Sequence, residues 1–129
     1  MEKPPPIKAR DLLGGEAIGF DEDTGGGKGR YIPDEGLMNP AGTVLGGYLS
    51  AMLDDVAGMA TWYAGGKRMF ATAQMSTSFL RAAKLGEPLI GESTVTGHGK
   101  RQAFAEATLS RESDGRIIAK ATLVQTFLD

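Results

Sequence analysis

The chain has 129 residues, a length that fits a single compact domain with enough residues to bury a hydrophobic core. Its 14 Lys and Arg residues against 16 Asp and Glu residues leave a formal net charge of −2, so the composition indicates neither a basic surface for nucleic acid nor an acidic tail. The chain has no cysteine, which excludes disulfides, thiolate metal sites and cysteine nucleophiles.

The first fifteen residues are expected to precede the folded domain. Met1–Arg10 is rich in proline and is expected to be extended, and a short helical turn is predicted at Asp11–Gly15. The segment has no apolar stretch of signal-peptide length, so we expect a cytoplasmic protein. We therefore divide the chain into an extended N-terminal segment, residues 1–15, and a single domain, residues 16–129.

Two strands are predicted next, joined as a hairpin. Glu16–Asp23 and Arg30–Glu35 have extended composition, and Thr24–Gly29 (TGGGKG) is predicted to be the flexible tip between them. Glycine-rich loops also bind phosphate, but the chain has neither G-x-x-x-x-G-K-[ST] nor G-x-G-x-x-G opening a helix. A hairpin turn is favoured over a phosphate loop.

A turn over Gly36–Thr43 is predicted to lead into a helix at Val44–Tyr63, with Thr43 as its N-cap. The first N–H groups of a helix have no intrahelical acceptor and lie at the positive end of the helix dipole. Gly46 and Gly47 can therefore present backbone donors to an incoming oxygen, as in an oxyanion hole. The alternative is that these glycines allow close packing against a strand.

The predicted helix has two different faces. At 100° per residue, one broad apolar face is expected to form the core, and it carries Leu45, Tyr48, Leu49, Met52, Leu53, Val56, Met59, Ala60 and Tyr63. The opposite face carries small residues where a surface helix usually has charges, which indicates a close neighbour: Gly47, Ser50, Ala51, Asp54, Ala57, Gly58 and Thr61.

Two adjacent acidic residues lie near the centre of this helix and, with its glycines, argue against a membrane span. Asp54 is expected in the middle of the small-residue face, and Asp55 nearer the flank. No Lys or Arg stands three or four residues from Asp54 to form an intrahelical pair. Asp54 is therefore functional, or it is a solvated residue or a polar anchor at a subunit contact.

Four strands are predicted after the helix, which is expected to end at Gly65. Met69–Leu80 alternates like a half-buried strand, with Met75 and Phe79 on one side and Thr72 and Gln74 on the other. The remaining strands are predicted at Pro88–Gly97, Gln102–Arg111 and Ile117–Leu128. This order predicts an α+β domain in which an antiparallel sheet wraps around the helix, and the sheet edges favour a homodimer that pairs edge to edge.

The segment N-P-A-G-T-V-x-G-G and the following small-residue helix with Asp54 resemble the hotdog-fold acyl-CoA thioesterases, in the branch of the phenylacetate-pathway enzymes. The resemblance extends from about Glu16 to Phe127 and includes RAAKLGEPL and DGRIIAKATLVQTF. It implies a hotdog fold, an acyl-CoA substrate, and a site assembled across a homodimer or a dimer of dimers. It implies no metal and no cofactor beyond the CoA of the substrate.

The resemblance also implies roles for matched residues. Asp54 would be the nucleophile or the general base, Asn39 would hold the water or the thioester, and the Gly46 N–H, with Gly47 beside it, would polarise the carbonyl. Thr72 matches the place where some members position the water with a hydroxyl, and it is equally explained as an ordinary strand threonine.

Leu45 stands where many members of the family have His. The Gly46 N–H survives this change, but an imidazole donor does not, and losing one such donor typically costs about 2.7–4 kcal/mol of transition-state stabilisation. Leu45 thus fits a slower enzyme, a differently oriented substrate, or a protein that binds acyl-CoA without hydrolysing it. Beside an enzyme and an acyl-CoA-binding protein, a scaffold whose helix face serves only dimer packing is a third alternative for the function. His98, the only histidine, is expected to be solvated. Hotdog hydratases and dehydratases rely on a histidine at the active site, so the resemblance favours thioester chemistry over hydration.

Lys100 and Arg101 are predicted either to contact the phosphates of CoA or to form a solvated hairpin tip. Arg81 and Lys84 follow the preceding strand, so several cations are expected near strand ends. A pocket for an aromatic or medium aliphatic acyl group could be lined by large apolar residues, although most of them are equally expected in the hydrophobic core. These residues are Tyr48, Met52, Met59, Trp62, Met69 and Phe70.

Overall fold

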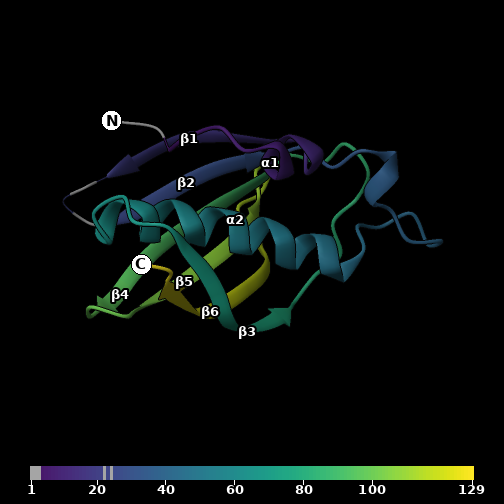
Figure 1. Cartoon of the computed structure of the whole chain (residues 1–129). Coiled ribbons are helices and arrows are strands. Elements are labelled where there is room, and N and C mark those ends of the chain that lie inside the picture. The colour runs from purple at the N-terminus through teal and green to yellow at the C-terminus, as the bar shows by residue number, and fades with distance from the viewer. Residues whose placement is uncertain (1–3, 22, 24) are drawn as a thin grey trace.

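The structure is a computed structural model that describes residues 4–21, 23 and 25–129. Figure 1 presents one long helix lying across a strongly curved sheet, with β1 and β2 above it and β3 below it. The helices are α1 (Lys8–Leu12), the 3₁₀-helix η1 (Glu35–Leu37) and α2 (Gly46–Ala64). The strands are β1 (Gly15–Asp21), β2 (Gly26–Tyr31), β3 (Phe70–Phe79), β4 (Leu89–His98), β5 (Gln102–Arg111) and β6 (Ile117–Phe127).

All six strands form one antiparallel sheet in the order β1-β2-β4-β5-β6-β3. The strand that follows α2 along the chain therefore lies at one edge of the sheet, and the N-terminal hairpin lies at the other. α2 packs against the middle of the sheet, so both sheet edges curve towards it (Figure 1). The predicted α+β hotdog fold, a sheet wrapped around one helix, is confirmed.

The core lies between α2 and the sheet. Seven apolar residues of α2 are almost fully buried: Leu49, Met52, Leu53, Val56, Ala57, Met59 and Ala60. The helix approaches the sheet closely where strands carry glycine, because a Cβ on Gly27 would lie 3.0 Å from the Cβ of Met59. The prediction that Thr24–Gly29 is a flexible hairpin tip is therefore wrong from Gly26 onward, since these glycines are strand residues that make room for α2. Glu22 and Thr24 lie outside the described residues.

The start of α2 differs from the prediction. The helix begins at Gly46 rather than Val44, and Leu45 occupies the N-cap position with an extended backbone and no capping side chain. Thr43 is therefore not the N-cap. Because Leu45 precedes the helical turn, the 100° periodicity does not apply to it, and its side chain is 49% exposed instead of contributing to the core. The helix ends with Gly65 as its C-cap, as predicted.

The N-terminal segment is more ordered than its proline content indicated. A helix, α1, begins at Lys8, where extended chain was expected, while residues 1–3 lie outside the described part of the chain. Leu13, just after α1, joins the hydrophobic core and is only 4% exposed. Within the described residues, no helix is both long and apolar enough to span a membrane.

The edge strand β3 is mostly exposed and not half-buried as predicted. Only Phe70, Met75 and Thr77 of its ten residues are partly covered. One side of β3 pairs with β6, whereas the other side has no neighbouring strand among the residues that the structure describes. An exposed edge of this length is a surface that commonly pairs with a second chain.

Candidate active site

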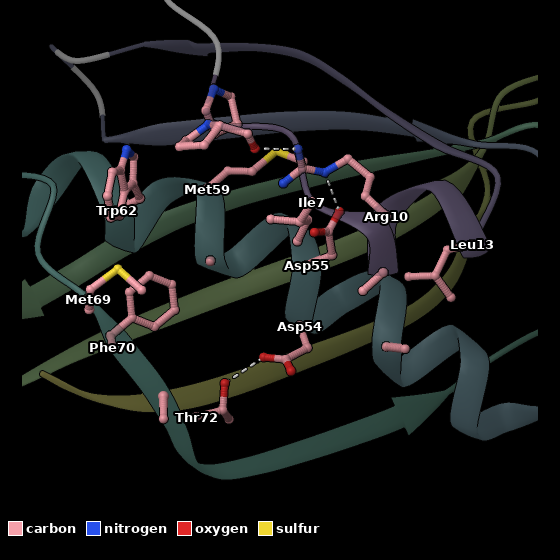
Figure 2. Close-up of a pocket in the computed structure, with 16 residues that line it drawn as sticks. Ile7, Arg10, Leu13, Asp54, Asp55, Met59, Trp62, Met69, Phe70 and Thr72 are labelled. Atoms are coloured by element: carbon pink, nitrogen blue, oxygen red, sulfur yellow. Dashed lines mark hydrogen bonds and ion pairs between the residues drawn. The ribbon is translucent and has the colours of Figure 1, made fainter. Parts of the chain in front are cut away.

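Asp54 lies on α2 and faces the edge strand β3. Its Oδ1 atom accepts a hydrogen bond of 2.6 Å from the Oγ1 hydroxyl of Thr72 (Figure 2). Among the described residues, no Lys or Arg forms an ion pair with Asp54. The structure therefore brings together two of the predicted site residues.

A β-bulge in β3 is responsible for this contact. Thr72 pairs with Gln125 of β6, but the next regular pair is Gln74 with Val124, so Ala73 is an extra residue. Residues directly opposite each other share a face of the sheet, and the face of β6 that carries Gln125 is the buried one. The prediction that Thr72 points away from Met75 is therefore wrong, because the bulge turns Thr72 to the α2 side.

Behind Thr72, a buried amide fixes the hydroxyl. Gln125 is fully buried, and its Nε2 donates to Thr72 Oγ1 over 3.3 Å. The Oε1 of Gln125 accepts in turn from the hydroxyl of Thr61, which is also fully buried. The chain of contacts fixes the direction of donation, because Thr72 Oγ1 receives a hydrogen from Gln125 and gives its own to Asp54. A buried network thus holds the Asp54 partner in one orientation.

Asn39 lies in the turn before α2, and its side chain stabilises that turn. Its Oδ1 accepts from the N–H groups of Ala41 (3.0 Å) and Thr43 (3.1 Å), and its Nδ2 donates to Thr43 Oγ1 over 2.9 Å. The Nδ2 group has a second hydrogen beyond this bond. Asn39 does not line the pocket beside Asp54 within one chain.

The first residues of α2 present unpaired backbone donors. The N–H groups of Gly46 and Gly47 reach no acceptor in the described part of the chain, and Gly47 is exposed. Gly46 and Asp54 are eight residues apart on the same helix, about 12 Å along its axis at 1.5 Å per residue. Gly46, Gly47 and Leu45 therefore do not meet the carboxylate of Asp54 within one chain.

Asp55 forms a second, buried acidic site that sequence reasoning missed. Its Oδ2 pairs with Arg10 Nε of α1 at 2.9 Å and accepts from the Tyr31 hydroxyl at 2.7 Å. The Asp55 and Arg10 side chains are only 5% and 8% exposed, so the flank of α2 that carries Asp55 is covered by α1. Burial, reinforced by the Asp55 charge, raises the pKa of Tyr31 far above its ordinary value. The missing intrahelical partner of Asp55 was the available indication of a distant cation.

A pocket of about 520 Å³ adjoins both acidic residues. Figure 2 shows Trp62, Met69 and Phe70 on one side of it and Ile7 and Arg10 on the other. The lining comes from residues 4–13 (Pro4, Pro5, Ile7, Ala9, Arg10, Leu13), from α2 (Ala51, Asp54, Asp55, Gly58, Met59, Trp62) and from the start of β3 (Met69, Phe70, Ala71, Thr72).

The pocket separates the six apolar residues singled out in the sequence. Met59, Trp62, Met69 and Phe70 line it, whereas Met52 is buried in the core and Tyr48 packs against the core. That residues 4–13 also line the pocket was not predicted from the sequence. Among the described residues, no three His, Asp or Glu side chains cluster as metal ligands.

Lys100 and Arg101 lie at the exposed turn between β4 and β5. Arg68 donates to the Lys100 carbonyl over 2.9 Å, and Leu128 donates to the Met69 carbonyl over 3.0 Å. Because Arg68 directly precedes Met69 in the chain, this turn lies near the end of the pocket that Met69 lines. Arg81 and Lys84 follow the other end of β3, so the cations form two separate groups instead of one.

A family model described as the thioesterase superfamily matches residues 41–118. The human protein acyl-coenzyme A thioesterase 13 is 28% identical over 87 residues, which are 67% of this chain and 62% of the human protein. The matched part of the chain thus spans less than two thirds of the length of this curated relative.

Solved structures have the same architecture. A candidate thioesterase related to phenylacetic acid degradation from Ralstonia eutropha is 31% identical, with a TM-score of 0.85 over 95% of this chain and 92% of that protein. A hypothetical thioesterase from Streptococcus pneumoniae, solved with coenzyme A, is 22% identical, with a TM-score of 0.79 over 88% of this chain and 85% of that protein. At that identity the second likeness concerns the fold.

Proposed function

The chain belongs to the thioesterase superfamily, and we propose that within it this protein hydrolyses an acyl-CoA thioester to a free acid and CoA. The observation that carries the proposal is the Asp54 carboxylate, oriented by the Thr72 hydroxyl at one end of an apolar pocket. Such a pocket suits an acyl group, and an unpaired carboxylate suits attack on the thioester carbon or activation of a water. The reaction needs no metal and no cofactor beyond the CoA of the substrate.

The proposed site combines residues from two copies of the chain. Gly46 and Asp54 are about 12 Å apart along one helix, so a single copy cannot place both at one carbonyl. Ala57 and Thr61 of the predicted small-residue face are buried within the chain, but the exposed Gly47, the half-buried Ser50 and Ala51, and the open edge of β3 allow a second copy to bring its own Gly46 and Asn39 to Asp54. We therefore propose a homodimer, or a dimer of dimers, with each site shared between two subunits.

The proposed reaction divides the work among these groups. With Asp54 as general base, the carboxylate takes a proton from water while the water oxygen bonds to the thioester carbon. With Asp54 as nucleophile, the carboxylate bonds to that carbon first, and water then cleaves the anhydride. In both routes the Gly46 N–H binds the developing oxyanion, the C–S bond breaks, and the CoA thiolate leaves and is protonated. Thr72 is a positioning residue that holds Asp54.

The CoA part of the substrate is proposed to lie at the β4–β5 turn. Lys100 and Arg101 are exposed there, near the Met69 end of the pocket, and CoA carries phosphates that cations bind.

A second function, acyl-CoA binding without hydrolysis, is favoured by one observation. Leu45 is 49% exposed at the start of α2, where it has no group to polarise a carbonyl. The two functions differ in turnover. Thiol release from a panel of short, medium, long and aromatic acyl-CoAs is expected for the wild type and lost in Asp54→Asn, while Asp23→Asn, an exposed control, keeps it. Binding of acyl-CoA without turnover by the wild type supports the second function instead.

The shared site has its own test. Asp54→Asn and Asn39→Asp are each expected to inactivate the protein, and Asn39→Asp keeps the oxygen that accepts from Ala41 and Thr43. In a random mixture half of the dimers are mixed, and each has one intact site, so about a quarter of the wild-type activity should return. A mixture that exchanges subunits but stays inactive contradicts the shared site.

A further inference from the structure

Residues 4–13 form one wall of the pocket beside Asp54, and a buried ion pair fixes this wall. Arg10 of α1 reaches Asp55 with its Nε atom at 2.9 Å and donates from Nη1 to the Pro5 carbonyl at 3.2 Å. One side chain therefore ties α2, α1 and the preceding proline segment together. Tyr31 of β2 adds a third attachment through its 2.7 Å hydrogen bond to Asp55.

The wall cannot swing away without exposing groups that are now buried. Arg10 and Asp55 are 8% and 5% exposed, and separating a buried pair leaves each charge without its partner. Leu13 is embedded in the core at the end of the segment. The Oδ1 atom of Asp55 is also buried and has no hydrogen-bond partner among the described residues. The segment therefore covers Asp55 closely.

The opposite wall is apolar. Met59, Trp62, Met69 and Phe70 form it, and the Phe70 ring lies against Gly58, where an added Cβ would be only 3.2 Å from the ring. The charges of Arg10 and Asp55 balance each other, so Asp54 is the one uncompensated charge that lines the pocket within the described chain. An acyl group with its own carboxylate would be repelled there.

We propose that residues 4–13, fixed by the Arg10–Asp55–Tyr31 contacts, are the specificity-determining wall of the acyl pocket and select compact, uncharged, apolar acyl groups. This inference rests on the proposed function, because it assigns the acyl end of the same substrate. The fixed wall bounds one side of a space of about 520 Å³, so an acyl chain that outgrows this space on that side must displace the segment. Binding of a long acyl chain therefore requires the free energy of separating the Arg10–Asp55 ion pair, whereas binding of a compact group does not.

The test compares three substrates: hexanoyl-CoA, palmitoyl-CoA and adipoyl-CoA, which is a six-carbon chain with a terminal carboxylate. The wild type should prefer hexanoyl-CoA over both others in kcat/KM. Arg10→Met keeps the apolar stem but not the ion pair, and it should raise the palmitoyl-to-hexanoyl ratio of kcat/KM about tenfold. The matched control is Arg111→Met, which removes the ion pair with Glu87 far from the pocket and should leave the ratio unchanged.

A second pair of variants tests the wall should Arg10→Met fail to fold. Ile7 lines the pocket and is 45% exposed, so it tolerates substitution. Ile7→Ala should raise the palmitoyl-to-hexanoyl ratio, and Ile7→Trp should raise the KM for hexanoyl-CoA several-fold. Ile18→Trp, at an exposed position of strand β1 that does not line the pocket, is the control.

The inference and the proposed function fail in different ways. In one outcome the wild type hydrolyses acyl-CoA while the palmitoyl-to-hexanoyl ratio of kcat/KM stays the same in folded Arg10→Met, or in both Ile7 variants. That result refutes the proposed specificity wall and leaves the proposed function intact. Calorimetric binding of hexanoyl- and palmitoyl-CoA to Asp54→Asn, with and without Arg10→Met, gives a readout without turnover. If Arg10→Met shifts binding towards palmitoyl-CoA and the wild type shows no turnover, the specificity role of residues 4–13 is supported and the proposed hydrolysis is refuted.

Discussion

The Thr72 hydroxyl offers the most direct test of how the Asp54 carboxylate is oriented. Thr72→Val removes the 2.6 Å hydrogen bond to Asp54 while keeping the shape and β-propensity of the side chain. A hydrogen bond to a charged group contributes about 1.5–3 kcal/mol. Thr72 is exposed in the single chain, so solvent screening places the effect near the lower limit. A loss of about 1.4 kcal/mol corresponds to about a tenfold drop in kcat.

The same substitution also removes an acceptor from the buried Gln125 amide, which should lower the free energy of unfolding by about 1 kcal/mol. Steady-state thiol release and urea unfolding separate these two effects. Thr72→Ser keeps the hydroxyl and should keep most of kcat. Thr77→Val, on the same face of β3, is the matched control. A Thr72→Val protein with kcat within about twofold of the wild type refutes the reasoning and makes Thr72 an ordinary strand threonine.

Three further predictions concern the rest of the chain. The pKa of Tyr31 is raised from 10.0 because burial disfavours the phenolate, so the folded protein keeps this proton where the unfolded chain loses it. Stability should therefore fall above about pH 10, by up to about 1.4 kcal/mol per pH unit, and urea unfolding of Tyr31→Phe should lack this component. Leu45→His should raise kcat about tenfold and change stability by less than about 0.5 kcal/mol, because Leu45 is exposed; an unchanged kcat would mean that an imidazole is not the missing group. Lys100→Ala/Arg101→Ala should weaken inhibition by free CoA about tenfold, unlike the two-charge control Lys28→Ala/Lys120→Ala, and equal inhibition constants would identify a solvated tip.

Much of the fold could be predicted because hydrophobic periodicity dominates its main elements. The burial of Leu49, Met52, Val56 and Met59 follows from 3.6-residue periodicity, and the strand at Gln102–Arg111 has the predicted limits. The position of Asp54 on an open face of the helix, with no partner on its own helix, was also predictable. These features depend on neighbours that are close in sequence.

The rest depends on contacts between distant residues, which periodicity does not report. Arg10 and Asp55 are 45 residues apart, and their pairing requires the fold that brings α1 onto α2. Gly27 belongs to a strand because the helix needs the space of a missing side chain, although glycine-rich sequence favours a turn. Leu45 has an extended backbone, since the helix begins one residue after it.

The bulge at Ala73 makes the site depend on how β3 pairs with β6 as well as on which residues β3 contains. Substitution of Ala73, which is exposed, leaves this pairing and the orientation of Thr72 intact. Strict alternation with Ala73 retained would pair Ala73 with Gln125 and turn the Thr72 side chain to the other face of the sheet, away from Asp54, whereas a strand without Ala73 would keep Thr72 opposite Gln125. A related chain that kept all these residues but paired them without the bulge would therefore orient an aligned threonine away from the carboxylate.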